Sequence, residues 1–132
     1  MARINIHTRF ISAIAFMLLA SSCSKSANFE ENYSTAKSNA SSGAGADYDR
    51  QLSAQLNGIP GLPRAISTCL GGDVSQTSAH GYFEIKSSTD YKLILEPKGK
   101  LSDCLTQTFE GQTLPAPPTT PYLNAFEFGI AP

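Results

Sequence analysis

Three cysteines are the residues of this 132-residue chain whose number and spacing point to definite chemistry. Cys23 lies near the start of the chain, whereas Cys69 and Cys104 lie in its second half. In an oxidising compartment an odd number of cysteines leaves one unpaired thiol, unless that thiol is modified. We therefore expect one cysteine to be covalently modified and the other two to form a disulfide.

The segment that precedes Cys23 indicates export from the cell. Arg3 and Arg9 come before an apolar run over residues 10–19, and small residues follow that run. A positively charged start, a short apolar stretch and a small-residue cleavage zone are typical of a secretory signal peptide. The apolar run has about half of the ~20 residues that a membrane-spanning helix needs. Residues 1–22 are therefore expected to be an export signal that is removed.

The residues around the expected cleavage point resemble the lipobox of bacterial lipoproteins. In that motif the cysteine thiol is acylated, with chains such as palmitate, and the cysteine becomes the first residue of the mature chain. The sequence here is Leu19-Ala20-Ser21-Ser22-Cys23. Ala20 and Ser22 also satisfy the small-x-small rule of ordinary signal cleavage, so secretion of a soluble periplasmic or extracellular protein is the alternative.

Lipidation of Cys23 accounts for the odd number of cysteines. It leaves Cys69 and Cys104 as a disulfide pair, with two buried free thiols as the alternative. Ser24 rather than an aspartate follows the cysteine. By resemblance to enteric sorting rules, this favours an outer membrane lipoprotein that faces the periplasm.

The composition excludes some partners and limits the size of the core. Lysine and arginine number 10 against 11 acidic residues, and removal of residues 1–22 makes the chain more acidic. A nucleic-acid partner is not expected, because it calls for a basic face. The length allows one domain, and the absence of tryptophan among many glycines and prolines predicts a modest core that a disulfide would help to stabilise.

The domain organisation follows from a change of composition near Asp47. Residues 23–46 are small and polar without an apolar period, which predicts a flexible tether behind the lipidated cysteine. Residues 47–132 are expected to form a single α+β domain. Apolar spacings of three and four predict helices, and alternation predicts strands. The expected helices cover residues 48–56, 63–70 and 101–109, and the expected strands cover residues 82–86, 91–96 and 122–130.

The cysteine and strand pattern is similar to the C-terminal domain of AgmX/PglI-type proteins, which are relatives of the TonB C-terminal domain. The resemblance covers residues 59–130. It rests on Ile66-Ser67-Thr68-Cys69-Leu70, Gly81-Tyr82-Phe83, Leu101-Ser102-Asp103-Cys104-Leu105, a Pro-x-Pro exit at 115–117 and Pro121-Tyr122-Leu123-Asn124-Ala125-Phe126-Glu127-Phe128. It implies a periplasmic domain in which two disulfide-linked helices pack on one face of a small antiparallel sheet. It also implies protein binding at the cell envelope without catalysis.

No catalytic, cofactor or metal site is expected in the mature chain. Its histidine, His80, falls in the polar stretch 73–80, which is read as a loop, and a solvated loop histidine is the simplest interpretation. No second histidine follows residue 22, and no serine lies in a Gly-x-Ser-x-Gly elbow. The expected function is therefore that of a non-catalytic protein-interaction module, which is held at the membrane by its lipid and binds an envelope protein.

The last strand is the element that we expect nearest to the binding surface. Asn124, Phe126, Phe128 and Ile130 share one face of it, and an edge position would leave its other backbone row open to a partner strand. The candidate partner-binding residues are Tyr122, Asn124 and Glu127. The alternative function is an inhibitor or immunity-type lipoprotein that blocks a periplasmic enzyme with the loop 73–80.

Overall fold

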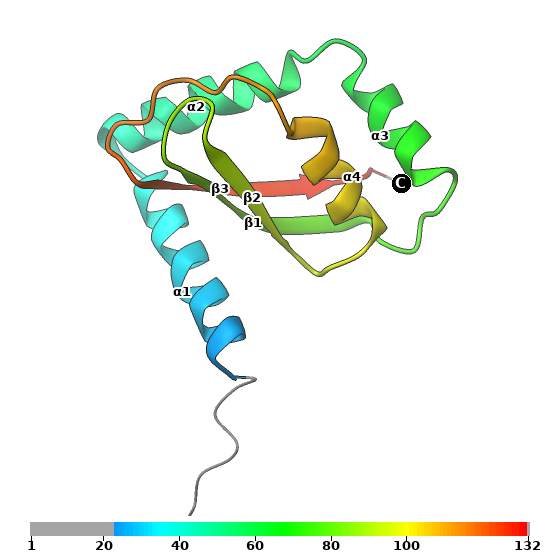
Figure 1. Ribbon diagram of the computed structural model, residues 1–132, viewed down its shortest axis with the longest axis horizontal. Coiled ribbons are helices and arrows are strands. Elements are labelled where there is room, and N and C mark those ends of the chain that lie inside the picture. The colour runs from blue at the N-terminus through cyan, green and yellow to red at the C-terminus, as the bar shows by residue number, and fades with distance from the viewer. Residues whose placement is uncertain (1–22, 132) are drawn as a thin grey trace, which may run out of the picture.

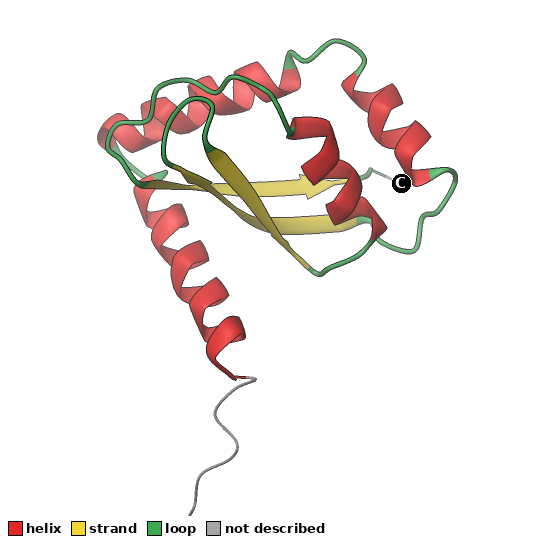
Figure 2. Cartoon of the chain, in the orientation of Figure 1, coloured by secondary structure: helices red, strands yellow, loops and turns green. Residues whose placement is uncertain are grey.

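The computed structural model describes residues 23–131, and the expected signal peptide at 1–22 lies outside the described residues. Four helices and three strands form one α+β fold (Figures 1 and 2). Their bounds are α1 Cys23–Asn39, α2 Gly43–Asn57, α3 Leu62–Leu70, β1 Ser78–Ile85, β2 Tyr91–Glu96, α4 Lys100–Phe109 and β3 Tyr122–Gly129. Within residues 23–131 no helix combines the length and the apolar character needed to cross a membrane.

The sheet is antiparallel, with β1 in the middle and the order β2-β1-β3. Gly81 of β1 lies opposite Leu95 of β2 and Phe126 of β3, which fixes both registers. The alternation of apolar residues in 122–130 predicted a strand, and the sheet order shows that this strand, β3, lies at an edge. The expected α+β class and the antiparallel sheet are confirmed.

One face of the sheet is covered by α2, α3 and α4. The predicted spacing in α2 places Tyr48, Leu52 and Leu56 on a single buried face, because residues four apart lie on the same side of a helix. These three residues belong to the main core together with Leu62, Ile66, Leu70, Ala79, Phe83, Ile85, Leu95, Leu101, Cys104, Leu105, Phe109, Leu114 and Tyr122. Three helices, rather than the expected two, contribute to this core.

The opposite face of the sheet is packed against α1, and the prediction of a flexible tether at 23–46 is wrong for this reason. Phe29, Tyr33 and Ala36 are buried at helical spacing, in a second cluster with Tyr82 of β1. The Nδ2 of Asn39 at the end of α1 donates a hydrogen bond to the backbone oxygen of Leu123, at 3.0 Å. The expected domain boundary at residue 47 falls inside α2, which begins at Gly43.

The disulfide between Cys69 and Cys104 is confirmed, and it joins α3 to α4 with a Cα–Cα distance of 5.7 Å. Cys104 is completely buried, and Cys69 is partly buried against the same core. Both cysteines lie on the apolar faces of their helices, so the bond holds two helices that pack side by side. This confirms the pairing that the odd number of cysteines favoured.

Candidate functional site: the open edge of β3

The backbone of β3 faces β1 with its even-numbered residues and faces away from the sheet with its odd-numbered residues. The N–H of Ile130 donates to the C=O of Thr77 at 2.8 Å, so this pair is hydrogen-bonded. Hydrogen-bonded and non-bonded pairs alternate along an antiparallel ladder. It follows that Leu123, Ala125, Glu127 and Gly129 direct their backbone groups outward, toward the open edge.

The outward groups of the first half of β3 are partly satisfied within the protein. The C=O of Leu123 accepts the hydrogen bond from Asn39, and the C=O of Ala125 accepts one from the Nδ2 of Asn124 at 3.0 Å. Within residues 23–131, the outward backbone groups of Glu127 and Gly129 have no backbone partner outside the sheet. Among the described residues the N–H groups of Leu123 and Ala125 also donate to no partner, so an extended chain could pair fully with the second half of β3 and through these N–H groups with the first half.

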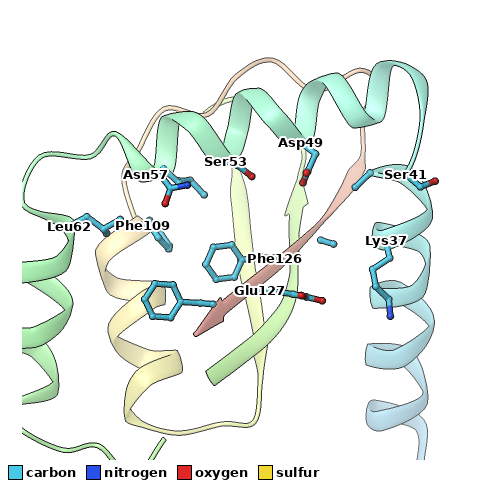
Figure 3. A pocket seen from close by; sticks show the side chains of 13 residues that line it. Lys37, Ser41, Asp49, Ser53, Asn57, Leu62, Phe109, Phe126 and Glu127 are labelled. Carbon is cyan, nitrogen blue, oxygen red and sulfur yellow. The ribbon is translucent and has the colours of Figure 1, made fainter. Parts of the chain in front are cut away.

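A cavity of about 350 Å³ runs along this edge between two helices (Figure 3). Its floor is β3, from Ala125 to Phe128. One wall is the end of α1, with Lys37, Ala40 and Ser41, and the other wall is α2. Figure 3 shows Asp49 and Ser53 of α2 facing the strand, with the ring of Phe126 between the walls. We call this cavity the edge groove.

A second cavity, of about 420 Å³, adjoins the edge groove at the end of β3. Asn57, Leu62 and Phe128 line both cavities, so the two are continuous. The other residues of the second cavity are Pro63, Ile66, Ser67, Leu70, Gly72, Asp73, Val74 and Ile130. Because most of these side chains are apolar, we call it the apolar pocket. The edge of β3 thus leads from polar walls to apolar ones.

The structure separates the three residues expected to bind a partner. Tyr122 is 7% exposed and Asn124 is 1% exposed, because both point to the core face of the sheet. Neither is therefore a surface residue, contrary to the expectation. Glu127 is exposed and lies on the groove. The structure assigns Tyr122 and Asn124 to the support of the edge from the core side.

A polar contact and an aromatic contact between α2 and β3 support the edge strand from the core side. The Nδ2 of Asn124 donates to the Oδ1 of Asp49 at 2.9 Å. The ring of Tyr122 packs edge-on against Tyr48 of α2, with centroids 5.3 Å apart. Burial raises the pKa of Tyr122, and the negative charge of Asp49 raises it further. The close approach requires Gly45, since a Cβ there would overlap the backbone of Asn39 and lie 2.7 Å from the Tyr122 hydroxyl.

The support leaves two buried polar atoms without hydrogen-bond partners among the described residues. These atoms are the hydroxyl of Tyr122 and the Oδ1 of Asn124. The Nδ2 of Asn124 already donates to two acceptors, so its Oδ1 is the atom that remains without a donor. Buried polar atoms are usually paired, and the exceptions call for an explanation.

The other side of the edge is fixed by an aromatic contact that the sequence reasoning missed. The hydroxyl of Tyr33 in α1 donates to the carboxylate of Glu127. Burial, followed by this bond and the charge of Glu127, raises the pKa of Tyr33 to about 12. The Nζ of Lys37 lies 4.3 Å from the centroid of the same ring. The side chain of Glu127 is thereby held toward α1, away from α2.

His80 also belongs to this contact, and the prediction that it is a solvated loop residue is wrong. Strand β1 begins at Ser78, so His80 lies inside the strand and is half-buried. Its ring centroid is 5.1 Å from that of Tyr33 and 5.8 Å from that of Phe29. The reason is that His80 is covered by α1, a helix that the sequence interpretation did not include.

Among the described residues, no group of three or more histidine, cysteine, aspartate and glutamate side chains is placed to hold a metal ion. Cys23 is the first residue of α1, and its side chain is not among those described.

The chain matches no family of known proteins, no curated protein and no solved structure.

Proposed function

We propose that this protein is a lipoprotein of the cell envelope that captures an extended segment of another protein at the open edge of β3. The observation that carries the proposal is the groove itself. The outward backbone groups of Glu127 lie on the floor of a cavity between two helices, and those of Gly129 follow next along the same open edge. Pairing of backbone groups gives affinity to such an interaction, and the walls give selectivity. The protein has no catalytic role in this proposal.

The arrangement of α1 supports the membrane-anchored form of the proposal. Helix α1 begins at Cys23, the residue expected to carry the lipid, and Figure 1 shows this end projecting away from the sheet. The buried residues Phe29, Tyr33 and Ala36 lie further along α1. A lipid at Cys23 would therefore sit at the opposite end of α1 from the groove, whose wall is formed by Lys37, Ala40 and Ser41.

The TonB-like resemblance supports the same interaction mode. That family implies an envelope domain that binds proteins, and β3 corresponds to the terminal edge strand that the resemblance covers. The disulfide between α3 and α4 agrees with the expected link between helices. An outer membrane position facing the periplasm follows from the sorting resemblance at Ser24.

A site-specific photo-crosslinker in living cells tests the proposal. Gly129 is a suitable position, because it is exposed and an added side chain would meet open space. Lys86 is a matched control, since it is exposed after the end of β1 that pairs with the start of β3. We expect a discrete protein adduct from position 129 and none from position 86. Equal adducts from the two positions, or none from either, would contradict the proposal.

A backbone substitution then tests whether the adduct depends on strand pairing. The change Glu127→Pro removes an outward N–H but leaves the bonds of β3 to β1 in place, and proline is tolerated on edge strands. Its control is Glu127→Ala, which removes the bond to Tyr33 but keeps the N–H. Loss of the adduct in the proline variant alone is the expected result.

The alternative, an inhibitor that blocks an enzyme with a protruding loop, is favoured by one observation. Val74, in the loop between α3 and β1, is 70% exposed. In that case a crosslinker at Ser75, which is exposed in the same loop and lines neither cavity, would give the adduct, and Glu127→Pro would leave the adduct unchanged. The two functions are therefore separated by the same experiment.

A further inference from the structure

We infer that the groove selects an extended segment with a basic side chain opposite Asn124 and an aliphatic side chain four residues away, opposite Phe128. The inference rests on the proposed capture of a strand by β3. It adds the chemistry of the captured segment, which the open backbone edge alone does not define. Its basis is the contrast between the polar edge groove and the apolar pocket.

The spacing follows from the geometry of a paired strand. Side chains of a strand alternate between the two faces of its sheet. A residue opposite Asn124 or Phe128 therefore places its side chain on the face covered by α2 and α3. Asn124 and Phe128 are four residues apart, and so are the two partner residues opposite them.

A donor is needed at the Asn124 end of the groove. Asp49 is half-buried there, and within residues 23–131 it forms no ion pair. The neighbouring Arg50 pairs with Asp47 instead. Asp49 lines the groove, together with Ser53 of the same helix. An arginine supplies several N–H donors and a positive charge, which matches this carboxylate and the neighbouring hydroxyl.

An aliphatic group is needed at the Phe128 end. The apolar pocket is lined there by Leu62, Ile66, Leu70 and Ile130, with the exposed Val74 at its rim. A leucine or isoleucine side chain of a partner would remove this surface from water. Burial of a side chain of this kind favours association, and the entropic costs of binding offset part of the gain.

Neither edge strand of a second copy meets the requirement. In β2 the residues four away from Lys92 are Ser88 and Glu96, so the strand offers no aliphatic side chain at that spacing. Strand β3 reads Tyr-Leu-Asn-Ala-Phe-Glu-Phe-Gly and contains no lysine or arginine to place beside Asp49. Pairing of two β3 edges would also bring the α1 and α2 walls of both copies together. The occupant is therefore a different protein segment.

Synthetic peptides test the inference on the full chain, produced by an exporting host so that the disulfide forms. The first peptide is Thr-Leu-Thr-Val-Thr-Arg-Thr, with capped ends and a fluorescent label; running antiparallel to β3, it places Leu opposite Phe128 and Arg opposite Asn124. Its comparisons are the same peptide with Glu in place of Arg, the same peptide with Thr in place of Leu, and the isomer Thr-Leu-Thr-Val-Arg-Thr-Thr, which moves the arginine to the other face. Fluorescence polarisation gives Kd for each.

We expect the first peptide to bind about tenfold more tightly than each comparison, as the loss of one charge-assisted or buried contact implies. The change Asp49→Asn keeps the contact to Asn124 and should abolish the preference for Arg over Glu. The matched control Asp47→Asn, on the same helix but outside the groove, should keep it.

Two results would overturn the inference, and they differ in what they say of the proposed function. Equal Kd values for all peptides, weakened together by Glu127→Pro, would leave strand capture standing without this selectivity. Absence of binding by every peptide, or binding that Glu127→Pro does not change, would overturn strand capture as well.

Discussion

The docking of α1 on the sheet can be tested with Phe29→Ala. Phe29 is 8% exposed, and its ring lies 5.6 Å from that of Tyr82 and 6.0 Å from that of Tyr33. The substitution leaves a cavity between α1 and the sheet. Its outcome depends directly on whether this helix is part of the folded domain.

The expected loss of stability is about 3 kcal/mol, the lower end for truncation of a buried phenylalanine, because the site lies near the end of the helix where the structure can relax. In a domain of this size, each kcal/mol lowers Tm by about 4 °C. The midpoint of thermal unfolding should therefore fall by about 12 °C.

Circular dichroism during heating measures the midpoint, and hydrogen exchange reports α1 separately. The control is Glu30→Ala, at an exposed position beside Phe29, which should leave Tm nearly unchanged. If both variants unfold at the same temperature and the amides of α1 exchange as fast as those of an unfolded chain, residues 23–39 are a tether after all.

Three further predictions follow from other features. Replacement of both Cys69 and Cys104 by alanine should lower the free energy of unfolding by about 4 kcal/mol, because the cross-link joins residues 35 apart in sequence and restricts the unfolded chain. Denaturant titration measures this loss, and an unchanged midpoint would contradict the prediction. The pKa values of Tyr33 and Tyr48 are raised to about 12, mainly by burial. The stability that the two tyrosines contribute is therefore complete below about pH 10 and is lost as pH rises to about 12. Urea titrations across this range should show the fall in stability, and Tyr48→Phe should make that fall smaller. Intact mass should show an acylated chain that starts at Cys23, and a soluble, unacylated chain with the same start would refute lipidation.

Much of the main core was predictable because its signals are local. The spacing of Tyr48, Leu52 and Leu56 defines one face of α2 without knowledge of the rest of the fold. The alternation in 122–130 predicted the last strand, and the count of cysteines favoured the disulfide; the edge position of β3 depends on the sheet order and is not a local property.

The groove was not predictable, because its walls come from segments whose meeting is set by tertiary packing. Phe29, Tyr33 and Ala36 have helical spacing, but the polar residues around them gave the segment the average composition of a disordered chain. The polar start of β1 was predicted to be a loop for the same reason. His80 is shielded there by α1, which the local sequence does not reveal. Nor does any local pattern place Asp49 beside β3, since that contact depends on how α2 docks.

If Cys23 carries the proposed lipid, α1 makes the connection between the membrane anchor and the edge groove rigid instead of flexible. A flexible chain would let the domain sweep through a hemisphere around its anchor, whereas 17 helical residues set a single reach of about 25 Å. Lys37 of the same helix lines the edge groove, so α1 sets both the distance of the groove from Cys23 and its orientation relative to the helix axis. A partner segment would then meet the edge at one altitude above the bilayer, and lengthening α1 by whole turns of helix should shift that altitude in steps of about 5.4 Å.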